Sequence, residues 1–254
     1  MKSFDLTGRV ALVTGGNGGI GLGIARGLAR AGASVVIAAR NAEKSSAAVE
    51  ELEALGARSL FVQTDVCEEA SCHGAMARAA SEFGRLDILV NNAGTTVRKQ
   101  PQDYSLEEWH AVMNTNLTSA FICARAAYPH MVRAGGGKIL MIGSMMSIFG
   151  AAYAAAYSAS KGGIVQLTKS LACAWAKDNI QVNAILPGWI DTDLTAAARQ
   201  QVAGLNERVL ARTPAGRWGK PDDFEGIAVF MAAPASDFMT GAAMPVDGGY
   251  SVQA

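Results

Sequence analysis

The chain has 254 residues, with 22 basic against 22 acidic side chains and 50% hydrophobic residues. Without a net basic charge it lacks the electrostatic signature of a nucleic-acid-binding protein, and its apolar stretches are too short to predict a membrane span. No Pro- or Ser-rich linker divides the sequence, so we expect one domain over residues 1–254. The first residues lack the apolar core of a signal peptide, which indicates a cytoplasmic location.

The first predicted elements are a buried strand over residues 9–14 and a glycine-rich turn over residues 15–21. A helix with apolar residues at helical spacing follows as far as Gly32, and a second apolar strand covers Val35–Ala39. This order predicts a dinucleotide site, because glycines let the backbone approach a pyrophosphate and a helix N-terminus offers it free N–H groups. The turn residues expected at the cofactor are Gly15, Asn17, Gly19, Ile20 and Gly21.

Five more strands alternate with helices along the rest of the chain. They are predicted at Ser59–Thr64, Ile88–Asn91, Lys138–Gly143, Gln181–Leu186 and Ala243–Val246. The alternation predicts an α/β fold, a doubly wound, mainly parallel sheet of Rossmann type with helices on both faces. Ligands bind beyond the carboxyl ends of such strands, and the polar motifs of this chain each follow a predicted strand directly. We therefore expect these motifs to meet at one crevice.

Tyr157 and Lys161 are four residues apart, so their side chains share one face if this segment is helical. A positive charge beside a phenol favours the phenolate and lowers the pKa of the tyrosine, which suits general acid–base chemistry near neutral pH. Taken alone, such a pair is more often an exposed aromatic residue beside a solvated charge. The neighbouring motifs decide between these interpretations.

The sequence carries five motifs in one order: Thr14–Gly21, Asn91–Gly94, Ser144, Tyr157 with Lys161, and Pro187 with Gly188. Over essentially the whole chain, their order and separation resemble the short-chain dehydrogenase/reductase family. The resemblance implies that Tyr157 is the catalytic acid and base, that Lys161 holds the nicotinamide ribose, and that Ser144 binds the substrate oxygen. Ser147 is a second hydroxyl in this loop, but Ser144 has the usual family separation from the tyrosine.

The resemblance implies further site residues. Asn116 matches a helix asparagine that supports the lysine through an ordered water, with Asn114 as its nearby competitor. Asp65 and Val66 match a pair that caps the adenine, although Asp65 could also cap the helix predicted from Glu68 onward. The remaining expected cofactor contacts are Asn92, Ala93, Gly94, Pro187, Gly188, Ile190 and Thr192, the last at the carboxamide.

The residue after the second strand bears on the choice between NAD(H) and NADP(H). A carboxylate there accepts hydrogen bonds from the ribose 2′-OH of NAD, whereas an arginine pairs with the 2′-phosphate of NADP. Arg40 follows this strand and no carboxylate precedes Glu43, which favours NADP(H) over NAD(H). Two points stay open, because Asn17 is not the second basic residue that many NADP-preferring members carry, and Arg40 could instead stack on the adenine.

Substrate contacts are expected from Arg98, Met146, Tyr153 and Trp189. Arg98 and Lys99 could bind a carboxylate together, although a solvated pair of loop cations is the commoner arrangement. Residues 191–212 are expected to form a mobile lid. Residues 91–104 and 212–219 look most like the gluconate 5-dehydrogenase and 2-deoxygluconate 3-dehydrogenase branch, which implies a hydroxy or keto substrate of sugar-acid or polyol type.

Two alternatives remain at this stage. A 3-oxoacyl-[acyl-carrier-protein] reductase would use the same catalytic residues, but no basic cluster for an acidic carrier stands out; a nucleotide-binding regulatory protein without catalysis is the other. No metal site is predicted, because Cys72 and His73 lack a second pair at zinc spacing. The resemblance also implies a homotetramer formed through the helices expected at 106–133 and 157–178.

Overall fold

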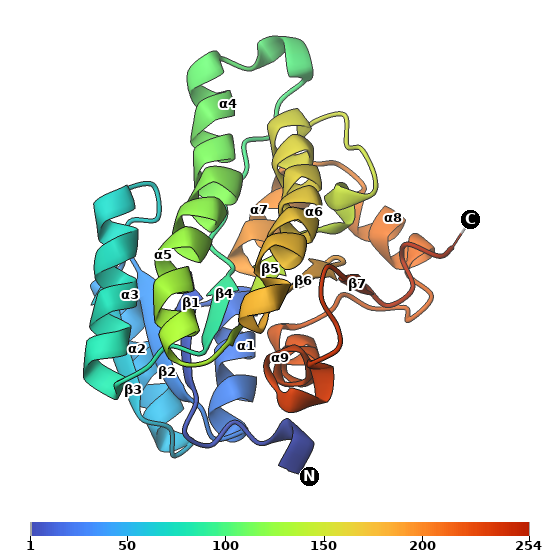
Figure 1. The fold of residues 1–254 in the computed structure, drawn as a ribbon. Helices are drawn as coiled ribbons and strands as arrows, with labels where there is room; N and C mark the ends of the chain where they lie inside the picture. Colours follow the sequence, from blue (N-terminus) through green and yellow to red (C-terminus); the bar gives the residue numbers. More distant parts are fainter. Residues whose placement is uncertain (1, 254) are drawn as a thin grey trace.

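The computed structural model describes residues 2–253 and contains one seven-stranded sheet in the order β3-β2-β1-β4-β5-β6-β7 (Figure 1). The strands are β1 Val10–Thr14, β2 Ser34–Ala39, β3 Ser59–Gln63, β4 Ile88–Asn91, β5 Gly137–Ile142, β6 Ile180–Pro187 and β7 Ala243–Val246. Every neighbouring pair is parallel, which confirms the predicted doubly wound α/β fold. The strand order reverses between β1 and β4, the place where this architecture opens a crevice for ligands.

The helices lie on both faces of the sheet (Figure 1). Their bounds are α1 Gly19–Arg30, α2 Ala42–Ala54, α3 Glu69–Phe83, α4 Leu106–Met113, α5 Ser119–Arg133, α6 Ala155–Trp175, α7 Asp193–Gln201, α8 Leu205–Arg212 and α9 Glu225–Ala232. A π-helical turn at Asn114–Thr118 joins α4 to α5, so the two helices form one continuous segment over the expected range. Among residues 2–253, no helix is both long and apolar enough to pass through a bilayer.

The central strands separate two apolar cores. Leu12 and Val36 belong to the core that includes buried residues of α3, α5 and α6, whereas Val13 and Ile37 belong to the core that includes residues of α1 and α9. Strands covered on both faces must be apolar throughout, which explains the continuous hydrophobic runs in the sequence. These two cores fix the carboxyl ends of β1, β4 and β5, from which the site is built.

Helices α7 and α8 stand apart from these cores. Their buried residues form a third, small cluster with the indole rings of Trp189 and Trp218, which meet edge to face with centroids 5.7 Å apart. The segment after β6 therefore has its own packing centre at the carboxyl edge of the sheet. It coincides with the expected lid over residues 191–212.

Candidate active site

The glycine turn between β1 and α1 has the backbone that its sequence predicts. Gly15 and Gly19 have φ angles of 62° and 52°, in the left-handed region that favours glycine. No side chain caps the N-terminus of α1, so its first amides are available to a phosphate. Gly21 is buried, and a Cβ there would lie 2.4 Å from Nδ2 of Asn92. Its role is close packing behind the turn, whereas the other predicted turn residues line a cavity.

Hydrogen bonds join the ends of β1 and β4. The hydroxyl of Thr14 accepts from the backbone N–H groups of Asn92 at 3.0 Å and Ala93 at 3.1 Å. The side-chain amide of Asn92 donates to the carbonyls of Thr14 and Gly15, both at 3.0 Å. The glycine turn and the Asn91–Gly94 turn are therefore held as one unit, in which the Asn92 amide contacts protein.

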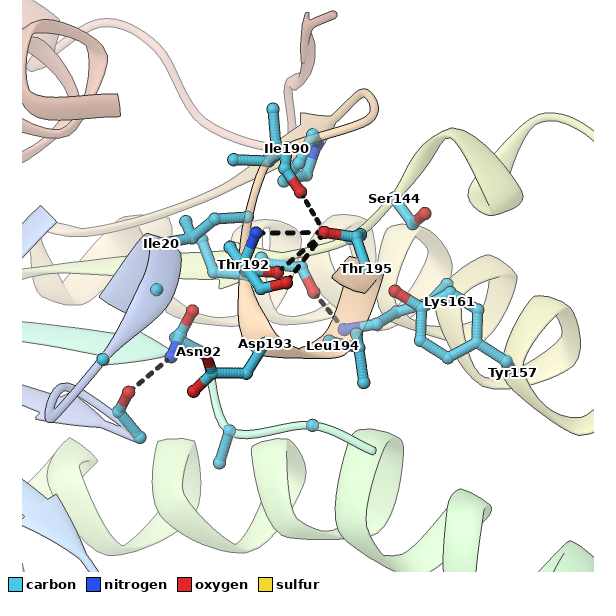
Figure 2. Close-up of a pocket in the computed structure, with 18 of the residues that line it drawn as sticks. Ile20, Asn92, Ser144, Tyr157, Lys161, Ile190, Thr192, Asp193, Leu194 and Thr195 are labelled. Carbon is cyan, nitrogen blue, oxygen red and sulfur yellow. Dashed lines mark hydrogen bonds between the residues drawn. The ribbon is translucent and has the colours of Figure 1, made fainter. Parts of the chain in front are cut away.

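The predicted cofactor residues converge on a cavity of about 340 Å³, shown in Figure 2. It is lined by Gly15, Asn17, Gly19, Ile20, Asn92, Ala93, Gly94, Ser144, Tyr157, Lys161, Pro187, Gly188, Ile190 and Thr192, among others. A second cavity of about 440 Å³ shares the glycine turn and extends to Arg40, Asp65 and Val66. The two cavities follow the carboxyl edge of the sheet from β3 to β6, and this extended shape fits a dinucleotide.

Ser144 and Tyr157 stand where the cofactor cavity meets a pocket of about 90 Å³, because both residues line both spaces. Ser144 follows β5, whereas Tyr157 and Lys161 lie in the first turns of α6. The Lys161 ammonium donates to the carbonyl of Ile142 at 2.7 Å and lies 5.6 Å from the centre of the Tyr157 ring. The structure thus places a hydroxyl, a phenol and an ammonium around the boundary between two compartments.

Burial dominates the titration of this group. It raises the pKa of Tyr157, while the neighbouring Ser144 hydroxyl and the positive charge of Arg98 act in the opposite direction. The net direction is opposite to the lowering expected from a neighbouring positive charge, because desolvation of the phenolate has the larger effect. Burial also lowers the pKa of Lys161 to about 8.

The side chains of Asn116 and Ser147 form hydrogen bonds that hold α6 against the loops around it. Asn116 is only 2% exposed, and its amide donates to the carbonyl of Thr95 at 2.9 Å and to the Ser160 hydroxyl at 3.0 Å. Asn114 is exposed, which agrees with the preference for Asn116. The Ser147 hydroxyl donates to the Lys161 carbonyl at 2.7 Å, so this second serine braces the loop against α6.

All four predicted substrate residues, Arg98, Met146, Tyr153 and Trp189, line the smaller pocket. The guanidinium of Arg98 donates to Oε1 of Gln201 at 3.0 Å and to the Leu194 carbonyl at 3.1 Å, both on α7. The neighbouring Lys99 forms an ion pair with Glu108. The two cations therefore do not face the crevice as a pair, and Arg98 alone contributes its charge to the pocket wall.

Two further features differ from the sequence interpretation. The carboxylate of Asp65 accepts from the Cys67 backbone N–H at 2.9 Å, while Glu68 precedes the first residue of α3, so the alternative role of Asp65 as the helix cap is wrong. Lys44 lines both cofactor cavities but is not among the site residues that the sequence predicts. Its only signal in the sequence is its place in the first turn of the helix after Arg40.

Comparison with known proteins gives consistent matches over the whole fold. The family described as "Enoyl-(Acyl carrier protein) reductase" matches residues 15–251. The chain is 42% identical over 251 residues to 2-dehydro-3-deoxy-D-gluconate 5-dehydrogenase of Escherichia coli (strain K12), a match that covers 98% of each chain. It is 38% identical to gluconate 5-dehydrogenase of Gluconobacter oxydans (strain 621H), over 98% of this chain and 97% of that one.

A crystal structure of gluconate 5-dehydrogenase from Burkholderia cenocepacia J2315, in complex with NADP and tartrate, superposes with a TM-score of 0.94. It is 40% identical, over 100% of this chain and 99% of that one. Together with the doubly wound sheet and the glycine turn, these matches define an NAD(P)-dependent dehydrogenase that acts on a CH–OH group. The chain belongs to the short-chain dehydrogenase/reductase family.

Proposed function

We propose that this enzyme interconverts a secondary alcohol and a ketone on a sugar acid of gluconate type, with NADP(H) as the preferred cofactor. One observation carries the proposal. Ser144 and Tyr157 line both the cofactor cavity and a smaller pocket whose wall includes Arg98. A substrate that fills this pocket meets the acid–base group and a positive charge at the same time.

The side chains at the boundary account for the proton chemistry. A nicotinamide bound in the larger cavity accepts or supplies the hydride. In oxidation the phenolate of Tyr157 takes the hydroxyl proton of the substrate, and in reduction the phenol returns it, help that is typically worth about 10²–10⁴-fold in rate. The Ser144 hydroxyl donates to the substrate oxygen as negative charge develops on it. The positive charge of Arg98 and the Ser144 hydroxyl favour the phenolate against the effect of burial.

Lys161 has a binding role in this proposal. Lys161 lines the cofactor cavity, where it would hold the nicotinamide ribose, and the Ile142 carbonyl fixes the direction of its ammonium. Asn116 acts as a positioning residue, because its hydrogen bonds join the Thr95 loop to Ser160 of α6. The catalytic pair on α6 is thereby held against the turn after β4.

The preference for NADP(H) rests on the adenosine end of the site. Arg40 lines this cavity, and the residues between β2 and Glu43 include no carboxylate to accept hydrogen bonds from a ribose 2′-OH. An arginine suits a phosphate because its planar fork donates two parallel hydrogen bonds. The similar enzyme from Burkholderia cenocepacia has a crystal structure with NADP, which supports the same choice.

The sugar-acid assignment rests on Arg98 and on the relatives. Arg98 is partly desolvated, and burial lowers the pKa of its guanidinium. An arginine stays protonated in proteins, so its charge is available to a carboxylate. Met146, Tyr153 and Trp189 supply apolar and hydrogen-bonding surface around it. Several of the similar enzymes are named for gluconate or a deoxygluconate.

A substrate panel tests this function. The purified enzyme is mixed with NADP⁺ or NAD⁺ and with aldonic acids, their neutral polyol counterparts, or the matching keto acids in the reverse direction, and reduced nicotinamide is followed by absorbance. We expect the highest kcat/KM for an acid with NADP(H). Faster reduction of 3-oxoacyl thioesters would favour the carrier-protein reductase, and binding of cofactor without any turnover would favour a regulatory protein.

A further inference from the structure

Lys44 connects three elements that surround the cofactor site. It lies in the first turn of α2, where its backbone N–H donates to the capping side chain of Asn41 at 2.8 Å. Its side chain crosses the glycine turn so closely that a Cβ on Gly18 would lie 2.9 Å from the Lys44 ammonium. The ammonium pairs with the carboxylate of Asp193 at 2.9 Å, and Asp193 is the first residue of α7.

Lys44 supplies a second positive charge for a phosphate at the adenosine end of the site. Arg40 is one cation at the adenosine end, but a phosphate ester with close to two negative charges is better matched by two cations. Asn17 in the glycine turn is neutral, and its amide is turned toward the Ser45 hydroxyl at 3.0 Å. Lys44 brings the missing positive charge to this turn from α2, and it is the cation that lines both cofactor cavities.

The ion pair with Asp193 is suited to being replaced. The Asp193 side chain is 93% exposed and that of Lys44 is 49% exposed, so water weakens their attraction. Figure 2 shows Asp193 next to Thr192 among the residues that line the cofactor cavity. Lys44 also lines the adjoining cavity that contains Arg40, so a phosphate bound there carries more charge than the carboxylate and competes with it for the same ammonium.

We propose that Lys44 is a second specificity-determining residue, which binds the 2′-phosphate of NADP(H) together with Arg40, and that Asp193 holds the ammonium until the phosphate replaces it. The inference rests on the proposed preference for NADP(H). It adds a consequence for the lid, because Lys44 links α2 to α7 only while it is paired with Asp193. The ion pair that links α7 to Lys44 is then kept when NAD(H) is bound and lost when NADP(H) is bound.

Binding titrations test the role of Lys44 without a substrate. NADPH and NADH are titrated by nicotinamide fluorescence into the wild type, Lys44→Gln, and the control Lys169→Gln, which changes an exposed lysine of α6. Loss of one charge-assisted bond should weaken NADPH binding about tenfold in Lys44→Gln. NADH binding should change less than about twofold, and the control should match the wild type, as expected of a surface change away from the site.

The outcomes separate this inference from the function on which it rests. Wild-type protein that binds both cofactors equally would overturn the NADP(H) preference and the role of Lys44 together. A wild-type preference that Lys44→Gln keeps would overturn the role of Lys44 alone. Equal weakening of NADPH and NADH would also overturn it, because Lys44 would then contact the pyrophosphate that both cofactors share.

A second variant tests the role of Asp193. Removing the competing carboxylate in Asp193→Asn should tighten NADPH binding about two- to fivefold, the range expected for an exposed ion pair. The gain should shrink at high salt and disappear in the Lys44→Gln background, since the two residues act through one interaction. Unchanged NADPH affinity in Asp193→Asn, or the same gain without Lys44, would contradict the exchange.

Discussion

The two walls of the active site are built differently. The wall at the carboxyl ends of β1, β4 and β5 is held by backbone hydrogen bonds and by polar side chains that are almost fully buried, such as Asn116 at 2% and Lys161 at 4% exposure. The opposite wall is α7, which shares a small apolar cluster with α8 and reaches the rest of the protein through exposed polar side chains. In the proposed function the first wall carries the acid–base chemistry, and the substrate pocket lies between this wall and α7.

Because of this difference, we expect the two walls to respond differently when ligands bind. Burial and dense hydrogen bonding give the first wall high local stability, which fixes reacting groups in place. On the second wall, Trp189 and Trp218 pack α7 against α8, whereas Arg98 and Lys44 tie α7 to the body. Helices with such ties can move as a unit when ligands compete for the same cations.

The largest effect is expected at the first wall. Tyr157→Phe keeps the ring and removes the proton, so turnover should fall by about 10²–10⁴-fold while the Kd for the cofactor changes little. Steady-state rates and a fluorescence titration on the same preparation check this. Retention of more than about a tenth of wild-type turnover would be too much for an enzyme that had lost its general acid.

Arg98→Ala tests the substrate pocket between the first wall and α7. If the guanidinium binds a substrate carboxylate, the KM for an acidic sugar should rise roughly ten- to hundredfold, whereas the KM of its neutral counterpart should change little. Arg98→Lys should restore only part of the loss, because an ammonium cannot reproduce the planar fork. Equal losses for acid and neutral substrate would show that Arg98 shapes the loop through its hydrogen bonds to α7.

Arg40→Asp tests the preference for NADP(H) at the adenosine end of the site. The change replaces attraction for the 2′-phosphate by repulsion and adds an acceptor for a ribose 2′-OH, so the ratio of kcat/KM for NADP⁺ to that for NAD⁺ should fall at least about tenfold. The ratio is measured with one substrate at saturating concentration. An unchanged ratio would mean that Arg40 does not contact the phosphate.

The smallest effect is expected in the pH profile, through the charge of Arg98. Oxidation needs the phenolate of Tyr157, so kcat/KM for oxidation should rise with pH toward the raised pKa of this residue, and the rate of reduction should fall there. Arg98 lowers this pKa by its positive charge, so Arg98→Ala should move the alkaline limb to higher pH. The profile is measured with a neutral polyol, and a limb at lower pH would contradict the assignment.

The sequence predicts the first wall well for a physical reason. Strand ends, a glycine turn and a helix with Tyr157 and Lys161 four residues apart are local patterns, and parallel strands bring their carboxyl ends together wherever they occur in the chain. Gly21 shows the limit of this reasoning. Its place in the motif predicts a residue at the cofactor, whereas the packing against Asn92 shows that it supports the turn from behind.

The remaining features of the site depend on contacts between residues that are far apart in the sequence. Lys44 and Asp193 are far apart in the sequence, and nothing near either residue predicts their ion pair. From the sequence, Arg98 and Lys99 could bind a carboxylate together. In the fold, Lys99 instead forms an ion pair with Glu108. The direction of the Tyr157 pKa was missed because desolvation depends on how many atoms surround the phenol, which the spacing of two residues in a helix does not reveal.

The separation of acid–base chemistry from substrate binding is tested most directly by single-turnover hydride transfer with the preferred acid. Enzyme in excess, saturated with cofactor and substrate, is followed by rapid-mixing absorbance for the wild type, Tyr157→Phe and Arg98→Ala, each at its own optimal pH. The rate constant of Arg98→Ala should stay within about tenfold of the wild type while that of Tyr157→Phe falls by about 10²–10⁴-fold. Equal loss in the two variants would contradict the separation of chemistry from substrate selection.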